Sequence, residues 1–294
     1  VGGTVERAFD LSKITYAQIP LHHWAWLTAV ILVVITWAIS LSMIYRHLER
    51  YDRPDVQRYV VRILFMAPLY ALDALLSLTF NNVSPYINVF RDCYEAFTVY
   101  NFLKMLFELL GGERAVISLM AAKKQIKMPF PLHWTDPWVM GDEMFYNVKF
   151  GVMQYVLVIP VCALATFVSA FAGAYEGSSW YTMDLWIQIV ACCSATWAIY
   201  CLVTFYMIMH EDLETVTVNP LGKFLVIKGV VFWCFFQHIL LQFVLLIGYI
   251  PATQQFTAMR LVDAVEQWLI CFEMVVLAVC LNLNFPVEEF AAEG

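Results

Sequence analysis

The stretch FRDCYEAFTVYNFLKMLFELLGGE, residues 90–113, combines two properties that rarely occur together. Its aromatic and aliphatic side chains suit hydrocarbon, yet before its glycine pair it also carries five charged residues: Arg91, Asp92, Glu95, Lys104 and Glu108. An isolated charge at the centre of a bilayer costs about 3 kcal/mol or more, so such residues face a bundle interior or a wet cavity. The stretch therefore predicts an interior helix of a membrane protein, with one polar face.

The composition of the whole chain agrees with that prediction. Of its 294 residues, 62% are hydrophobic and only 14% are charged, whereas soluble domains are about half apolar and about a quarter charged. A bilayer core needs roughly 20 helical residues to cross it. We predict an all-α fold, a single polytopic membrane domain over residues 1–294 with seven transmembrane helices, at 24–44, 60–80, 91–110, 149–171, 185–209, 224–247 and 261–283.

The basic residues in the short loops predict the orientation of the bundle, because Lys and Arg favour cytoplasmic loops. The second and fourth loops, 81–90 and 172–184, contain neither Lys nor Arg. The first and third loops are basic, through Arg46, Arg50, Arg53, Arg58, Arg114, Lys123, Lys124 and Lys127. We therefore expect the N-terminus outside and the C-terminus in the cytoplasm.

The third loop has local structure of its own. Gly111 and Gly112 predict a left-handed cap that ends the third span. Residues 113–128 have an apolar face and a basic end, and they predict a helix along the inner membrane surface, near anionic lipid. The alternative is an ordinary solvated loop.

The third span carries a polar stripe. Tyr94, Thr98, Asn101, Lys104 and Glu108 follow one another at steps of 4, 3, 3 and 4, so they share one face of a helix. The spacing predicts two i,i+4 ion pairs, Arg91–Glu95 and Lys104–Glu108, with an acid from a neighbouring helix as the alternative partner of Arg91. The stripe either lines a solute pathway or locks the bundle.

Other spans contribute polar residues at similar depth. Lys228 of span six is expected to snorkel to the inner membrane surface. Span seven has a stripe of its own, made of Asp263, Glu266, Glu273, Cys280 and Asn284. The candidate pathway residues, taken from five spans, are Asp73, Arg91, Asp92, Glu95, Thr98, Asn101, Lys104, Glu108, Gln154, Tyr155, Gln237, Glu266 and Glu273.

Signatures of enzymes are missing from the sequence. The segment HEDLE at 210–214 lacks the second histidine of a zinc-protease helix, and neither a phosphate-binding glycine loop nor a GxSxG motif occurs. The eight cysteines fall inside predicted spans, which argues against a disulfide scaffold and a CxxC metal site. We expect no enzyme, no cofactor, no metal and no nucleic-acid partner.

Four segments carry a family resemblance. HLERYDRPDVQRYVVRILFMAPLY (47–70), RDCYEAFTVYNFLKMLFELLGGE (91–113), KFGVMQY (149–155) and NPLGKFLVIKGVVFWCFFQ (219–237) resemble the organic solute transporter alpha / transmembrane protein 184 family. The resemblance covers about residues 24–283. It implies seven spans with the N-terminus outside, and movement of amphipathic organic solutes.

Within that family, the transporter alpha branch implies bile acids and steroid conjugates as solutes, facilitated diffusion and a single-span beta subunit. That branch has a cysteine-rich tract before the fourth span, whereas residues 123–147 here contain no cysteine. The chain therefore resembles the transmembrane protein 184 branch more closely.

Together these patterns predict a facilitative transporter or lipid-handling protein for amphipathic, steroid- or lipid-like solutes. The expected partners are membrane lipids, a small amphipathic solute and a single-span or other membrane protein, in the plasma membrane or an endomembrane. The alternatives are a non-transporting receptor or trafficking protein, and a structural subunit of a larger membrane assembly. At membrane depth acids outnumber bases, so the interior suits cations or neutral amphipaths better than anions.

Overall fold

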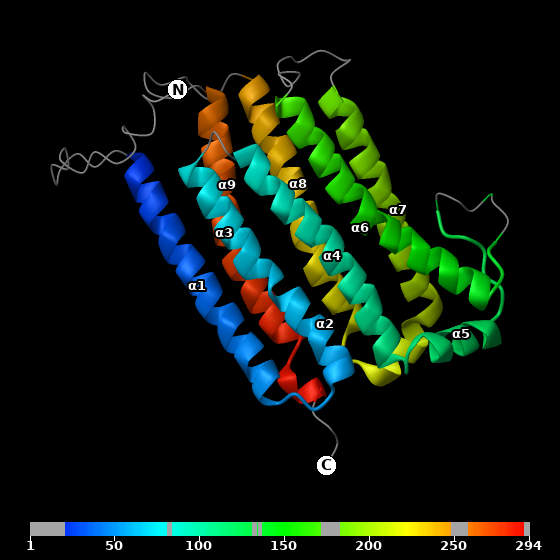
Figure 1. Ribbon diagram of the computed structural model, residues 1–294. Helices are drawn as coiled ribbons and strands as arrows, with labels where there is room; N and C mark the ends of the chain where they lie inside the picture. The colour runs from blue at the N-terminus through cyan, green and yellow to red at the C-terminus, as the bar shows by residue number, and fades with distance from the viewer. Residues whose placement is uncertain are drawn as a thin grey trace.

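A computed structural model describes residues 21–80, 84–130, 134, 137–171, 183–247 and 258–290 of the chain. These residues form helices and no strand, which confirms the all-α prediction (Figure 1). Along the described chain the helices are α1 (Leu21–Glu49), α2 (Pro54–Leu64), α3 (Met66–Thr79), α4 (Ser84–Leu109), α5 (Glu113–Ala122), α6 (Asp142–Phe171), α7 (Met183–Val216), α8 (Pro220–Leu246), α9 (Ala258–Asn284) and the 3₁₀ helix η2 (Val287–Phe290).

Five helical segments among the described residues are long and apolar enough to cross a membrane: His23–Glu49, Pro54–Thr79, Asp142–Val168, Trp186–Val216 and Leu261–Asn284. Large apolar side chains such as Val161, Leu164 and Leu240 lie exposed on the outside of the bundle. Extensive apolar surface of this kind suits contact with lipid rather than water. The chain is therefore an integral membrane protein, and its seven-span count remains a prediction.

The long helices lie side by side, and α4 lies among several of them (Figure 1). α4 packs against α2, α3 and α6, while α9 packs against α1, α3 and α8, and α6 pairs with α7. Phe102, Leu103 and Phe107 of α4 are fully or almost fully buried. α4 is thus the interior helix that its sequence predicts. It begins earlier than expected, because residues 84–90 of the predicted second loop are helical, and residues 172–182 of the predicted fourth loop lie outside the described part.

The second predicted span is two helices rather than one. α2 ends at Leu64, Phe65 follows as a turn, and α3 begins at Met66. Pro68 has no N–H to donate to the carbonyl of Leu64, which explains an interruption at this point. The carbonyl of Pro68 accepts a hydrogen bond of 3.0 Å from Trp37 Nε1, which joins α3 to α1. α6, by contrast, continues as one helix through Pro160.

The end of α4 confirms the glycine cap. Gly111 and Gly112 have φ of 93° and 91°, a conformation that costs glycine little. The N–H of Gly112 donates to the Phe107 carbonyl at 2.8 Å and that of Gly111 to the Glu108 carbonyl at 3.1 Å, which is a Schellman arrangement. The chain then turns into α5, which lies across the end of the bundle (Figure 1). α5 stops at Ala122, before the predicted end at 128, because Lys123 is extended.

Candidate functional site

The polar residues of α4 divide into two groups along the helix. Those near its beginning contact polar side chains of α3, α6 and α8, and those near its end contact charged side chains of α2 and α5. We call the first group the central cluster. Its members are Tyr70, Asp73, Arg91, Asp92, Glu95, Tyr155, Lys228, Cys234 and Glu273. We call the second the α5-end network, which comprises Arg58, Lys104, Glu108, Glu113 and Lys149.

Arg91 lies between two acids of the central cluster. Its Nη1 is 3.5 Å from Asp73 Oδ2 on α3, and its Nε is 3.7 Å from Asp92 Oδ1. The prediction of an Arg91–Glu95 pair is wrong, whereas the alternative, an acid from a neighbouring helix, is confirmed. Asp73 is only 4% exposed, and within the described residues neither of its carboxylate oxygens has a hydrogen-bond partner. Arg91 and Asp73 are therefore close enough to form an ion pair, yet both carboxylate oxygens of Asp73 can still accept hydrogen bonds.

Glu95 connects three helices. Its Oε1 accepts 3.0 Å from Lys228 Nζ on α8 and 3.3 Å from the hydroxyl of Tyr155 on α6. Lys228 is 3% exposed and lies 5.8 Å from the centre of the Tyr155 ring. The expectation that Lys228 snorkels to the membrane surface is wrong. A carboxylate and an aromatic face already surround its ammonium group.

Glu273 of α9 adds a further carboxylate to the cluster. Its Oε1 accepts from Trp233 Nε1 at 2.9 Å, and its Oε2 accepts from the Cys234 thiol at 3.2 Å. Cys234 also interacts electrostatically with Arg91 and Glu95. Glu273 and Glu95 therefore belong to one polar region. Tyr70 completes it from α3, buried and with a hydroxyl that has no hydrogen-bond partner in the described structure.

The α5-end network is closed by ion pairs. Glu113 of α5 pairs with Lys104, and both of its oxygens accept 2.8 Å hydrogen bonds from Lys149 of α6. Those hydrogen bonds, from Lys104 first and then Lys149, hold the pKa of the Glu113 carboxyl below its ordinary value of 4.5. Glu108 lies 3.7 Å from Arg58 of α2. The predicted Lys104–Glu108 pair is therefore wrong, because α5 and α2 supply the partners.

Thr98 and Asn101 lie between the two groups, and both are buried. The Thr98 hydroxyl donates to the Tyr94 carbonyl at 2.9 Å, and Asn101 Nδ2 donates to the Phe97 carbonyl at 2.6 Å. Asn101 Oδ1 accepts from Arg62 Nη1 of α2 at 3.2 Å. Their hydrogen bonds are made within α4 and to α2.

The remaining candidates lie on other helices. Gln154 is held by Ser194 of α7, whose carbonyl accepts at 2.9 Å and whose hydroxyl donates at 2.7 Å, so it ties α6 to α7. Gln237 of α8 has a buried Nε2 without a hydrogen-bond partner in the described structure. Glu266 interacts electrostatically with Glu273 on the same helix.

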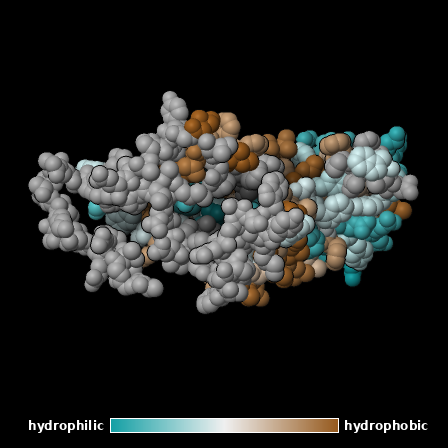
Figure 2. Space-filling view, turned by 90° about the horizontal axis from the view of Figure 1, so that it is seen from above, coloured by the Kyte–Doolittle hydropathy of each residue, from teal (hydrophilic) through white to brown (hydrophobic). Residues whose placement is uncertain are grey.

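Figure 2, viewed from the end of the bundle opposite α5, shows hydrophobic atoms along the sides of the molecule. The side chain of Asp92, close to the beginning of α4, is 57% exposed. The central cluster therefore has one carboxylate in contact with the surroundings, while Asp73 and Lys228 lie within the protein.

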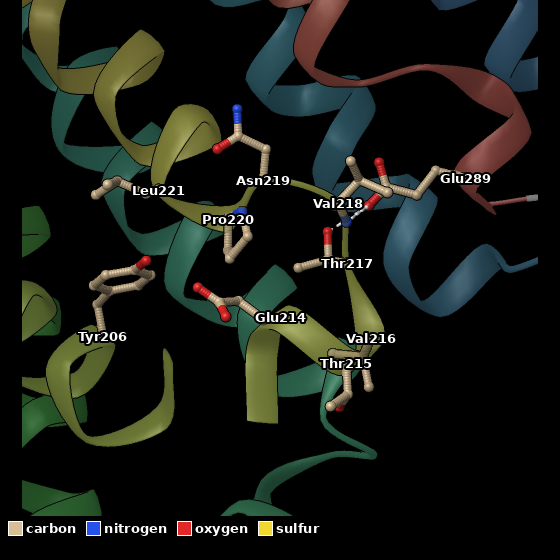
Figure 3. A pocket seen from close by; sticks show the side chains of 10 residues that line it. All are labelled: Tyr206, Glu214, Thr215, Val216, Thr217, Val218, Asn219, Pro220, Leu221 and Glu289. Atoms are coloured by element: carbon tan, nitrogen blue, oxygen red, sulfur yellow. Dashed lines mark hydrogen bonds between the residues drawn. The ribbon is translucent and has the colours of Figure 1, made fainter. Parts of the chain in front are cut away.

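A separate surface pocket of about 620 Å³ lies where α7 meets α8. Figure 3 shows Tyr206, Glu214 and Glu289 around it, with the α7–α8 turn between them. None of the candidate pathway residues lines it. Beside it, the fully buried Lys223 donates to both carboxylate oxygens of Glu289 at 2.8 Å, which fastens η2 to the beginning of α8.

Several residues in or beside the central cluster were not identified from the sequence. Tyr70, Trp233 and Cys234 look like ordinary apolar or aromatic residues of a span, and only the packing of the helices brings Trp233 and Cys234 to Glu273. Lys228 offered a signal, since it lies several residues inside an apolar helix. Among the residues that the structure describes, no group of three His, Cys, Asp or Glu side chains could hold a metal ion.

Comparison with known proteins identifies the family of the chain. The family model for the organic solute transporter Ostalpha matches residues 25–290, nearly the whole described bundle. The chain belongs to this family. Within it, the chain is similar to relatives of the transmembrane protein 184 type, as the cysteine-free third loop predicts.

Three similar proteins come from Arabidopsis thaliana. Protein LAZ1 homolog 2 is 34% identical over 86% of this chain, protein LAZ1 homolog 1 is 31% identical over 91%, and protein LAZ1 is 29% identical over 92%. The chain spans 65%, 58% and 59% of the lengths of these three relatives. No solved structure matches the chain.

Proposed function

We propose that this Ostalpha-family chain binds amphipathic, steroid- or lipid-like solutes and passes them across its membrane through the central cluster. The observation that carries the proposal is Asp73. A carboxylate buried to 4% exposure, with two oxygens that lack hydrogen-bond partners in the described structure, leaves acceptors for a solute or for water. Ionisable residues at membrane depth mark substrate pathways when they face a bundle interior.

The topology in this proposal has seven spans, with α2 and α3 counted as one. Five described helical segments are long and apolar enough to cross a membrane. α4 has 26 residues and carries five charged side chains, each paired with another charged group, and α8 is a 27-residue helix with mostly apolar residues. α1 begins at the end of the bundle opposite α5, and α9 finishes at the α5 end (Figure 1). Together with the basic first and third loops, this supports an outside N-terminus and a cytoplasmic α5 end.

The route in this proposal runs from Asp92 towards Asp73 and Glu95. The side chain of Asp92 is half-exposed, Arg91 forms ion pairs with both Asp92 and Asp73, and Lys228 joins Glu95 to α8. A chain of ion pairs between different helices can exchange partners with a polar solute at each step. The movement is facilitated diffusion, and membrane lipids and a single-span or other membrane protein are the proposed partners, in the plasma membrane or an endomembrane.

One observation favours a second, structural function for the polar stripe of α4. The α5-end network has its charges paired, with Glu113 between Lys104 and Lys149 and with Glu108 beside Arg58. Asn101 is likewise hydrogen-bonded. If the whole chain were a receptor, trafficking protein or structural subunit, the central cluster would act in the same way, as a lock between helices.

A flux assay tests the proposal. The purified full chain is reconstituted into vesicles, and uptake of a labelled neutral steroid is measured beside uptake of its sulfate and its amine derivative. The proposal expects saturable uptake above that of protein-free vesicles, reduced about tenfold by Asp73→Asn because a buried polar contact is lost. Uptake no faster than in protein-free vesicles for every derivative would overturn it in favour of the structural function.

A further inference from the structure

Among the residues that the structure describes, Glu273 differs from the other acids of the central cluster in having no cation paired with it. Arg91 forms ion pairs with Asp73 and Asp92, and Lys228 forms one with Glu95. Within the described part of the chain, Glu273 accepts hydrogen bonds only from the indole of Trp233 and the thiol of Cys234, and it forms no ion pair there. An ionised carboxylate at this depth is costly unless a positive charge joins it. The described residues around Glu273 therefore supply hydrogen-bond donors and no positive charge.

Glu273 also lies near the lipid-facing surface. The Trp233 side chain that donates to it is 65% exposed, so the indole reaches from the outer face of α8 to the acid on α9. Trp233, Phe236 and Leu240 follow at helical steps of 3 and 4, and each is more than 60% exposed. On α9, the exposed Phe272 precedes Glu273 in the chain. An apolar strip along α8 thus leads to a carboxylate and an aromatic ring.

We propose that Glu273 and the ring of Trp233 bind the ammonium group of a cationic amphipath, whose apolar tail lies along α8 in the lipid. The inference rests on the proposed function and names its solute class. A carboxylate neutralises an ammonium, and the face of an indole attracts it further. An anionic headgroup would meet Glu273 with no cation to offset the repulsion, and a neutral one would leave the carboxylate uncompensated.

Photo-crosslinking tests this site without a transport assay. The probe is an alkyl trimethylammonium with a diazirine in its tail, whose charge is independent of pH, applied to the full chain in lipid nanodiscs. Matched probes carry a neutral alcohol or a sulfate on the same tail. We expect the ammonium probe to label peptides of α8 and α9 around Trp233 and Glu273, about tenfold more than either matched probe.

Variants assign the labelling to the two residues. Glu273→Gln is expected to reduce ammonium labelling about tenfold, Trp233→Leu to reduce it several-fold, by roughly the cation–π contribution, and Trp233→Phe to retain most of it. Glu143→Gln, an exposed acid of α6, is the matched control and is expected to change nothing. Should Glu273→Gln fail to fold, Trp233→Leu carries the same test, since its ring is on the surface.

The outcomes separate this inference from the proposed function. Equal labelling by all three probes, or undiminished labelling of Glu273→Gln, would overturn the ammonium site, even if neutral steroid uptake still depended on Asp73. Ammonium labelling that depends on Glu273, in a chain that shows no uptake, would support the site and overturn transport instead.

Discussion

The first and second halves of α4 use charge in opposite ways. In the second half, Glu113 receives hydrogen bonds from two lysines, and the network closes on itself. In the first half, Arg91 and Asp73 are 3.5 Å apart and leave both oxygens of Asp73 without hydrogen bonds in the described structure. Closed pairs hold helices together, whereas incompletely satisfied buried groups cost stability. One helix can therefore carry a structural group of charges near its end and a group with unused hydrogen-bond acceptors near its beginning.

The largest expected effect lies at the α5 end of the bundle. Lys223→Met should lower the free energy of unfolding by about 3–5 kcal/mol, because Glu289 would remain almost fully buried without its cation. Denaturant titration in detergent micelles measures it. Lys124→Met, at an exposed lysine of the third loop, is the control and should stay within about 0.5 kcal/mol. Equal, small effects of the two variants would contradict a structural role for this end.

Glu113→Gln should have the next largest effect, a loss of about 1–3 kcal/mol of unfolding free energy. The change leaves Lys104 and Lys149 without their shared carboxylate. Uptake per folded molecule should not change, because the residue lies outside the central cluster. A variant of normal stability with reduced uptake would place the α5-end network on the pathway and remove the contrast between the two halves.

Gly111→Ala should cost about 1 kcal/mol, since an alanine at φ of 93° is strained and its Cβ would lie 3.3 Å from that of Ala115. Gly229→Ala is the matched control within α8. Nothing lies within 4 Å of the added Cβ there, so it should be neutral or stabilise the helix by about 0.5–1 kcal/mol. Thermal unfolding of the two variants side by side checks this, and a Gly111→Ala protein as stable as wild type would argue against the cap.

The smallest expected effect is a pH dependence of the α5-end network. Hydrogen bonds from Lys104 and Lys149 lower the pKa of Glu113 in the folded state, so its stabilisation is fully present above its ordinary value of 4.5 and is lost as the pH falls below that value. The difference in thermal midpoint between wild type and Glu113→Gln should therefore shrink on acidification from pH 6 to about 3.5. A difference that grows over that interval would contradict the assigned ion pairs.

The fold was largely predictable because apolar runs of membrane length have few other outcomes. The helices fall where hydropathy places them, and Gly111–Gly112 ends α4 as its glycines indicate. The interruption at Phe65 follows from Pro68, although a hydropathy run alone reads as one span. What the apolar pattern could not give was the earlier beginning of α4 and the early end of α5, both of which depend on local contacts at the helix ends.

The charge pairing was less predictable, for a physical reason. Spacing of four residues brings Arg91 near Glu95 on one helix, but a buried ion selects its partner by distance and desolvation across all packed helices. Arg91 pairs with Asp73 of α3, and Glu95 pairs with Lys228 of α8. Nothing in the sequence links residue 95 to residue 228. The depth of α4 in the bundle was predictable, and the identity of its partners was not.

We propose that the central cluster binds a solute, whereas the α5-end network stabilises the fold. Uptake of a labelled amphipath per folded molecule, measured in one vesicle preparation for Asp73→Asn and for Glu113→Gln beside their thermal midpoints, separates these two roles. The account predicts that Asp73→Asn loses uptake about tenfold at a nearly unchanged midpoint, and that Glu113→Gln lowers the midpoint at unchanged uptake. Normal uptake in Asp73→Asn, or a loss of uptake that only follows its loss of folded protein, would contradict it.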